Sequence, residues 1–162
     1  MRRVGGLEAR GITLMESLLA AAILATAAAV VIVPFSAGAQ SVAQDARQTL
    51  AVSLAEGLME EVLSKAFSDP DGSEAGENRR SRWDDMDDYH GYQEAEGAIV
   101  EADGTAVTDP AATALSRRVM VESVYVAGQD HGEPATFLRI TVEVRHHGAP
   151  VVTLSRLKYS NE

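Results

Sequence analysis

Gly11-Ile12-Thr13-Leu14-Met15-Glu16 opens the stretch that decides the fold of this chain. The residues that follow it carry no charge, and the most apolar of them run from Leu18 to Phe35. A helix needs roughly 20 apolar residues to cross the hydrocarbon core of a bilayer, and this run comes close to that length. The sequence therefore predicts a membrane-spanning helix half over residues 12–36.

Three basic residues, Arg2, Arg3 and Arg10, precede the apolar run within its first short flank. Positive charge next to a membrane span favours the cytoplasmic side. We therefore expect a single-pass protein of the inner membrane, with a cytoplasmic N-terminus and with the rest of the chain periplasmic or extracellular.

Glu16 lies at the mouth of the apolar run, where a carboxylate is unfavourable by up to roughly 2.5–3.5 kcal/mol and needs a cationic partner. Cleavage after Gly11 would create one, because the new α-amino group on Ile12 would lie four residues before Glu16. In an assembly, that amine could pair with Glu16 of a neighbouring chain and remove two unpaired charges from the apolar phase.

The stretch from Gly11 to Glu16 resembles the type IV prepilin cleavage motif, although that family usually has Phe where Ile12 stands. The resemblance implies a leader, residues 1–11, that prepilin peptidase removes by cutting after Gly11, and N-methylation of Ile12. It also implies that the chain assembles with other pilin or pseudopilin subunits on an inner-membrane platform. The residues implied for assembly are Glu16, Thr13 and Leu14.

A second interpretation treats the N-terminus as an ordinary secretory signal. Ala37-Gly38-Ala39 has the A-x-A pattern of a signal cleavage site, so residues 1–39 could be removed before Gln40. The length of the apolar stretch and the charge of Glu16 argue against this interpretation.

Small residues recur at every fourth position of the apolar run, which places them on one helix face. Such faces let helices approach closely in lipid, although an Ala-rich anchor would carry the same pattern. These residues are Ser17, Ala21, Ala25 and Ala29. Pro34, where many pilins have a proline, predicts a kink because it removes one helical hydrogen bond.

An amphipathic pattern follows the apolar run and predicts a second helix half over residues 37–67. Two neighbouring rows of apolar residues form its stripe: Val42, Ala46, Leu50, Leu54, Leu58, Val62 and Ala66, with Ala51, Ala55, Met59, Leu63 and Phe67. Asp69-Pro70-Asp71-Gly72 then ends the helix.

Residues 68–162 predict a globular head with a connecting loop over 68–97 and antiparallel strands over about 98–158. Asp103-Gly104 is a hairpin turn signal, and apolar residues alternate with polar ones between Leu138 and Arg145. The expected fold class is α+β of the type IV pilin-like kind, in which a long N-terminal helix packs on a small antiparallel sheet.

The loop joins a basic run, Arg79-Arg80-Ser81-Arg82, to the block from Trp83 to Tyr92. Together with the helix end and the Phe67-Ser68-Asp69-Pro70 break, this block resembles the D-type minor pilins of the mannose-sensitive haemagglutinin family. We expect the arginines to neutralise the neighbouring aspartates. The aromatic residues Trp83, Tyr89 and Tyr92 should pin the loop to the sheet, with a sugar-binding platform as the alternative.

Calcium is a weak possibility, because clustered carboxylates suit this ion but the spacing does not match an EF-hand. The weak calcium candidates are Asp84, Asp85, Asp87 and Asp88, and a weaker set is Asp69, Asp71, Glu74 and Glu77. The histidines, expected to lie in solvated turns, are His90, His131, His146 and His147. Adjacent strand residues point to opposite faces, so the pair His146-His147 is not expected to share a metal.

Composition narrows the functional classes. The net charge of −10 disfavours nucleic-acid binding, and the absence of cysteine excludes disulfides and thiolate metal sites. No G-x-S-x-G, P-loop or H-E-x-x-H motif occurs, so neither enzymatic activity nor a firm cofactor is predicted. The predicted function is that of a minor structural subunit of a type IV pilus-like fibre. The alternatives are a minor pseudopilin of type II secretion and an exported calcium- or ligand-binding module.

Overall fold

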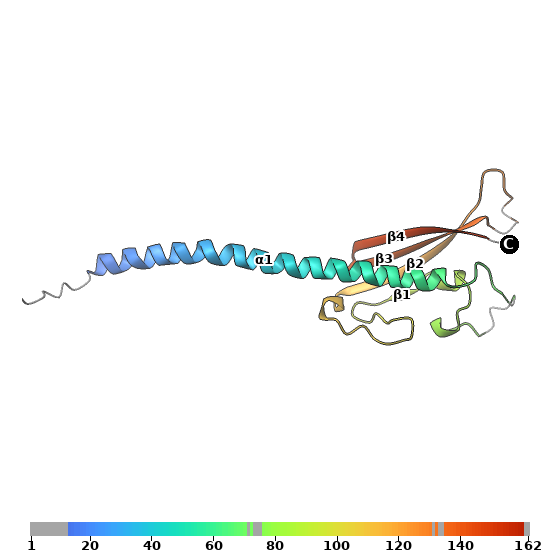
Figure 1. Ribbon diagram of the computed structural model, residues 1–162, viewed down its shortest axis with the longest axis horizontal. Helices are drawn as coiled ribbons and strands as arrows, with labels where there is room; N and C mark the ends of the chain where they lie inside the picture. The colour runs from blue at the N-terminus through green and yellow to red at the C-terminus, as the bar shows by residue number, and fades with distance from the viewer. Residues whose placement is uncertain (1–12, 71, 73–75, 131, 133–134, 161–162) are drawn as a thin grey trace, which may run out of the picture. The chain divides into compact units, whose positions relative to one another are not determined.

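A computed structural model of the chain describes residues 13–70, 72, 76–130, 132 and 135–160. Its single α-helix, α1, spans Leu14–Leu63 and continues through Pro34 (Figure 1). The chain divides into two compact units, Met1–Val42 and Ala43–Glu162. The first half of α1 belongs to one unit, and the second half belongs to the other, which also holds every strand.

The second unit contains one antiparallel sheet with the strand order β1-β2-β3-β4 (Figure 1). Its strands are β1 (Gln93–Glu94), β2 (Leu115–Val124), β3 (Phe137–His146) and β4 (Ala149–Tyr159). Three short 3₁₀ helices lie in the connections: η1 (Arg80–Arg82), η2 (Asp87–Tyr89) and η3 (Pro110–Ala112). The expected α+β layout, a long N-terminal helix packed on a small antiparallel sheet, is thus confirmed at this level.

The turn between β3 and β4 consists of two residues with positive φ, His147 at 47° and Gly148 at 74°. Two consecutive left-handed residues match the right-handed twist of a hairpin, and glycine adopts this conformation without a steric penalty. A register shift lies between Val144 and Arg145, so that Val144 pairs with Val152 and Arg145 pairs with Pro150.

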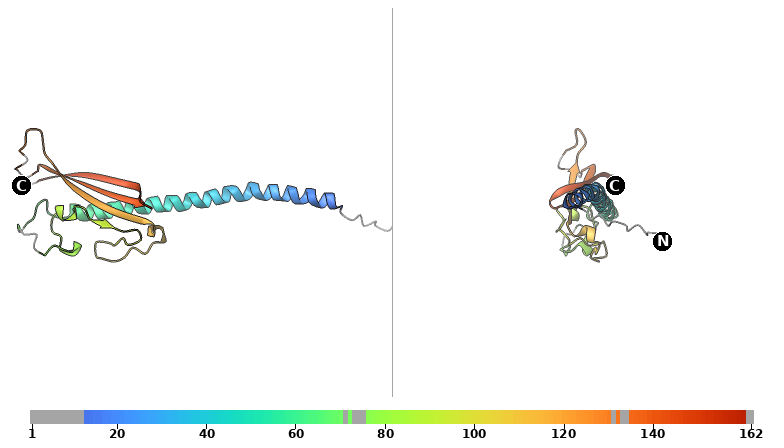
Figure 2. Two further views of the ribbon diagram at one scale, coloured as in Figure 1. Left: turned by 180° about the vertical axis from the view of Figure 1, so that it is seen from behind. Right: turned by 90° about the vertical axis from the view of Figure 1, so that its left-hand side faces the viewer.

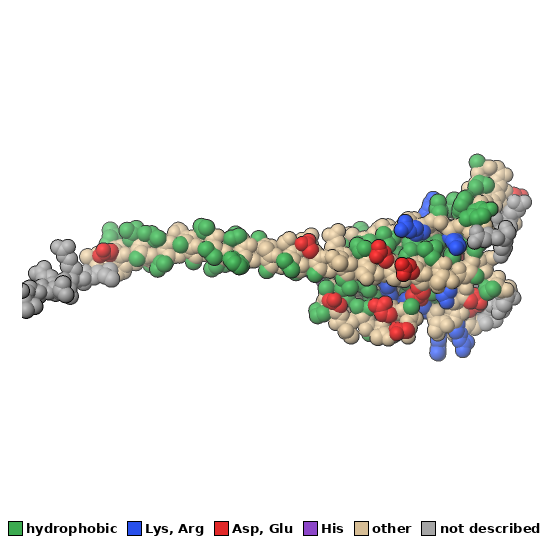
Figure 3. Space-filling model, viewed as in Figure 1, with side chains coloured by type: hydrophobic (Ala, Val, Ile, Leu, Met, Phe, Trp, Pro, Cys, Tyr) green, Lys and Arg blue, Asp and Glu red, His purple; other side chains and the backbone are tan. Residues whose placement is uncertain are grey.

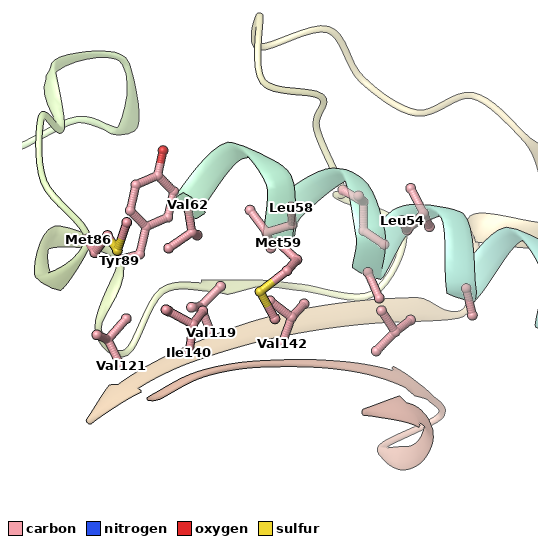
Figure 4. Packing of buried hydrophobic residues seen from close by; sticks show 14 of the residues in the cluster. Leu54, Leu58, Met59, Val62, Met86, Tyr89, Val119, Val121, Ile140 and Val142 are labelled. Carbon is pink, nitrogen blue, oxygen red and sulfur yellow. The ribbon is translucent and has the colours of Figure 1, made fainter. Parts of the chain in front are cut away.

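The core lies between the second half of α1 and the inner face of β2 and β3 (Figure 4). Residues from α1 that are fully or almost fully buried are Ala51, Leu54, Ala55, Leu58, Met59 and Val62. They face alternate residues of the strands, among them Val119, Ile140 and Val142, because side chains two apart in a strand share a face. The predicted stripe is therefore confirmed over these turns, whereas Val42 remains 69% exposed.

The helix ends at Leu63 and not at the predicted Phe67. Ala66 forms a parallel β-bridge with Asp85, and its N–H and C=O bond Asp84 and Met86. The apolar pattern therefore extends to Ala66 and Phe67, but the helix does not. The backbone of Ala66 is bonded to the loop around Asp85 instead.

In the first unit, the described residues of α1 are all exposed, and Figure 3 shows apolar side chains along the visible face of this part of the helix. Leu18, Leu24, Ile32 and Phe35 are each at least 60% exposed. By length and composition the helix is apolar enough to cross a membrane, although a signal sequence near an N-terminus satisfies the same criterion.

Candidate functional site

Thr13 and Glu16 form a reciprocal cap at the first turn of α1. The N–H of Glu16 donates to Thr13 Oγ1 at 3.3 Å, and the N–H of Thr13 donates to Glu16 Oε2 at 3.4 Å. This is the geometry of a capping box, in which two backbone donors that the helix leaves unsatisfied find side-chain acceptors. Glu16 therefore has a local role in the single chain. Gly11 and Ile12, the predicted cleavage and methylation residues, lie outside the described residues.

The rest of the predicted assembly stretch is fully accessible in the single chain. Leu14 is 80% exposed, and the small residues Ser17, Ala21, Ala25 and Ala29 are all exposed. Ser17 also donates its hydroxyl to the carbonyl of Thr13 at 3.3 Å, which adds to the cap.

Asp85 and Asp88 use their carboxylates to organise the acidic block. Asp88 Oδ2 accepts the N–H of Asp84 at 3.0 Å, and Asp85 Oδ1 accepts the N–H of Asp88 at 3.1 Å. Asp87, in contrast, is exposed. Two of the four calcium candidates thus serve the backbone of their own loop.

Asp85 is only 2% exposed, although it lies among acidic residues. Burial, a hydrogen bond with the side chain of Asp87 and the charges of Asp87 and Asp88 raise the pKa of Asp85 to about 7. A buried carboxyl beside other carboxylates is more stable in its neutral form. Near neutral pH the block therefore carries less negative charge than its composition suggests.

Among the described residues, carboxylates from both predicted calcium sets come together as a candidate for holding an ion. Glu77, Asp84 and Asp88 each place one oxygen within 4.8 Å of the others, and all three are half-buried. Hard oxygen ligands of this kind suit calcium, but acidic groups often gather without an ion. In the weaker set, Asp69 caps its own turn by accepting the N–H of Gly72 at 2.8 Å. Asp71 and Glu74 lie outside the described residues.

The prediction that Arg80 neutralises the acidic block is wrong. Its guanidinium forms ion pairs with Glu61 of α1 and with Glu94 of β1, the latter at 3.1 Å. Arg80 also donates to the Val100 carbonyl at 3.1 Å. Glu61 and Glu94 are largely removed from water and need a cation, whereas Asp85, the buried carboxyl group of the block, has a raised pKa that favours its neutral form. Arg82, for its part, bonds the Gly76 carbonyl at 3.4 Å.

Arg117 of β2 is the second cation of this buried network, and its side chain is only 2% exposed. It pairs with Glu94 and donates to the carbonyls of Leu54 and Val100. The four charged side chains balance one another, two cationic and two anionic, as buried charges require. Sequence reasoning missed this network. One signal of the network is visible in the sequence: Arg117 alternates with Leu115 and Val119, which places it on the core-facing side of a strand.

Two tyrosines complete the network and connect it to the aromatic cluster. Tyr89 donates to Glu61 and Tyr92 donates to Glu94, both at 2.8 Å. Burial and these carboxylates raise the pKa of Tyr89 and of Tyr92. Burial alone would raise the pKa of Glu61, but the hydrogen bonds from Arg80 and Tyr89 outweigh it and lower that pKa.

The aromatic cluster confirms that the loop is pinned to the core. Trp83 meets Tyr89 edge-on at 4.7 Å between ring centroids and meets Tyr92 at 5.2 Å. Tyr89 is fully buried, and Trp83 and Tyr92 pack against the same core.

The described histidines differ from expectation in one respect. The rings of His146 and His147 lie 4.3 Å apart, so the prediction that they point to opposite faces is wrong. His147 belongs to the left-handed turn and not to the strand, and strand alternation therefore does not apply to it. His90 Nδ1 lies 2.6 Å from the Val121 carbonyl and binds the edge of β2. His131 lies outside the described residues.

Comparison of the chain with protein-family models, with curated proteins and with solved structures returns no match.

Proposed function

We propose that this chain is a minor structural subunit of a type IV pilus-like fibre. The observation that carries the proposal is the motif from Gly11 to Glu16 at the start of an apolar helix whose second half packs on an antiparallel sheet. The first half of the helix is apolar and exposed, and the second half buries one face against the sheet. Such a helix suits a subunit that lies in lipid before assembly and contacts other subunits in the fibre.

In this proposal prepilin peptidase cuts after Gly11 in the inner membrane and methylates the amine of Ile12. The freed amine pairs with Glu16 of an adjacent subunit and sets the register between helices. Fibre assembly would then satisfy a carboxylate that is unfavourable in lipid. The small-residue face, which is exposed in the single chain, lets the helices approach closely.

The capping box allows a test that separates the two roles of Glu16. Glu16→Gln keeps the cap, because glutamine is also found at this position of a capping box, but it removes the charge. Thr13→Val removes the hydroxyl of the cap and leaves the charge. Incorporation into sheared surface fibres is expected to fall far more for Glu16→Gln than for Thr13→Val, with normal cleavage and membrane retention in both.

The size of the effect follows from the ion pair. Removing one member of a buried pair is unfavourable by roughly 3–5 kcal/mol, which lowers incorporation a hundredfold or more. Equal, mild losses for the two variants would mean that Glu16 acts as a helix cap only, and the proposal would fail. If the subunit enters fibres that stay within the cell envelope and never reach the surface, a minor pseudopilin of type II secretion would be favoured over a pilus subunit.

A second candidate function rests on Glu77, Asp84 and Asp88, whose oxygens come together in the structure. It is that of an exported calcium-binding module that uses its N-terminus only as signal or anchor. This candidate requires folding to depend on calcium, which the fibre proposal does not.

A further inference from the structure

β4 has one free edge along its whole length. It is the last strand in the order β1-β2-β3-β4, and no segment among the described residues pairs with its outer side. From Val151 to Ser155 it carries no charge, and Arg156 and Lys158 follow. Proteins usually guard exposed edges with charge or proline, because unpaired N–H and C=O groups bind other strands. In β4, such protective residues occur only near the two ends of the strand: Pro150 at the start, and Arg156 and Lys158 toward the end.

A small hairpin extends the opposite side of the same unit. Val100 and Ala106 form an antiparallel bridge, and bonds from Glu101 to Thr105 and from Val107 to Ile99 flank it. Residues in such a non-hydrogen-bonded pair direct their N–H and C=O groups away from each other. The backbone of Val100 accordingly meets Glu94, Arg80 and Arg117, whereas that of Ala106 points outward.

The two edges have opposite charge. Glu101 and Asp103 mark the hairpin, and the N–H of Thr105 lowers the pKa of Asp103, so this carboxylate stays ionised. Figures 1 and 2 place the loop that holds the hairpin beyond β1, on the other side of α1 from β4. One molecule thus presents a basic edge and an acidic edge on opposite sides.

We propose that the basic edge of β4 in one copy binds the acidic hairpin of residues 99–107 in the next copy, with extended backbone facing extended backbone. This inference rests on the proposed function, because it names a contact between neighbouring subunits of the fibre. A second copy of this chain is the partner that we propose, because each copy carries both the basic edge and the acidic edge that binds it. Different patches that bind each other form a head-to-tail contact, which does not close into a symmetric pair and can repeat along an open filament.

The pairing of two β4 edges is a poorer solution. It would bring Arg156 and Lys158 of both copies to the same interface without any acidic partner from β4, which contains no Asp or Glu. Charges within about 10 Å of each other still interact at ordinary ionic strength, so the head-to-tail contact is favoured.

The absence of cysteine in the natural chain makes cross-linking a direct test. Full-length protein in its producing membrane would carry Ala106→Cys together with Thr153→Cys or Ser155→Cys, positions that are all exposed. Oxidation should give a ladder of oligomers for at least one of these pairs. Ala106→Cys with Ser123→Cys, also exposed but away from β4, is the matched control and should give at least tenfold less product.

Charge reversal makes the test specific. Arg156→Glu with Lys158→Glu should lower the ladder severalfold, and adding Glu101→Lys should restore part of it. Dimers from Ser155→Cys alone, in place of a ladder, would show symmetric pairing of β4 and overturn the inference. Normal fibres without any ladder would also overturn it and leave the proposed function intact. A ladder in membranes that never form fibres would support this contact while the fibre proposal fails.

Discussion

Arg117 of β2 and Glu94 of β1 form an ion pair that is almost completely removed from solvent, with side-chain exposures of 2% and 4%. Arg117 also donates to the carbonyl of Leu54 in α1 at 3.0 Å. One guanidinium therefore ties the helix to the sheet, and the loop is tied to the same point through Val100. The network around this pair holds the helix, the loop and the sheet edge in one arrangement.

Arg117→Ala should destabilise the second unit by about 3–5 kcal/mol, because it leaves Glu94 with less compensation in a buried site. Urea unfolding of the full-length chain in mild detergent, followed by tryptophan fluorescence, measures this through Trp83. Arg118→Ala is the matched control. Its side chain is 38% exposed in its pair with Glu143, so a change below about 1 kcal/mol is expected. Equal losses for the two variants would contradict a special role of the buried pair.

Asp85 should make stability depend on pH. Its pKa of about 7 in the folded chain lies above the usual value of 3.8, so the folded state holds a proton that the unfolded state releases. The contribution of Asp85 to stability is therefore fully present below about pH 4 and is lost as pH rises from about 4 to about 7, at no more than about 1.4 kcal/mol per pH unit. Asp85→Asn should match the natural chain at pH 4 and exceed its stability at pH 8.

The measurement is the difference in unfolding free energy between the natural chain and Asp85→Asn across this range. Taking the difference cancels the titration of carboxylates common to both proteins. Glu56→Gln, at an exposed position of α1, is the control and should show a smaller dependence. A difference that does not change with pH would show that Asp85 titrates near its ordinary value.

The acidic block should not require calcium. Asp85 and Asp88 already bond the loop backbone, which gives these carboxylates a structural use. An ion that binds only the folded state raises its stability by mass action, by about 2.7 kcal/mol at a hundredfold excess over the dissociation constant. The melting temperature of the full-length chain should therefore change little between excess calcium and chelator. A large rise that Asp84→Asn abolishes would favour the calcium-binding module.

Cleavage is expected after Gly11 and not after Ala39. The motif and the misplaced charge of Glu16 both favour the first site. The intact mass of protein extracted from membranes distinguishes the two, because the second cut would remove the whole apolar run. A soluble chain that begins at Gln40 would end the fibre proposal. Gly11→Ala, which alters only the residue before the scissile bond, should leave the leader in place.

The sequence by itself determined the elements whose signals are local. An uncharged apolar run specifies the first half of α1, and the period of the stripe specifies which side of the second half, from Ala51 to Val62, is buried. Alternation specifies β3, and Asp103-Gly104 specifies the turn of the small hairpin of residues 99–107, since these patterns depend only on residues close together in the sequence.

Tertiary structure alone decided which charges meet. Arg80 lies five residues from Asp85 in the sequence, yet it bonds Glu61, which is 19 residues away, and Arg117 reaches Leu54 across 63 residues. The carboxyl groups of Asp85 and Glu61 are both shielded from water, but the carboxylates beside Asp85 favour its neutral form, whereas the hydrogen bond from Arg80 lowers the pKa of Glu61. The same long-range packing ends α1 at Leu63, where the loop near Asp85 takes over the backbone of Ala66. Local periodicity carries no information about such contacts, because desolvation depends on what the rest of the chain places nearby.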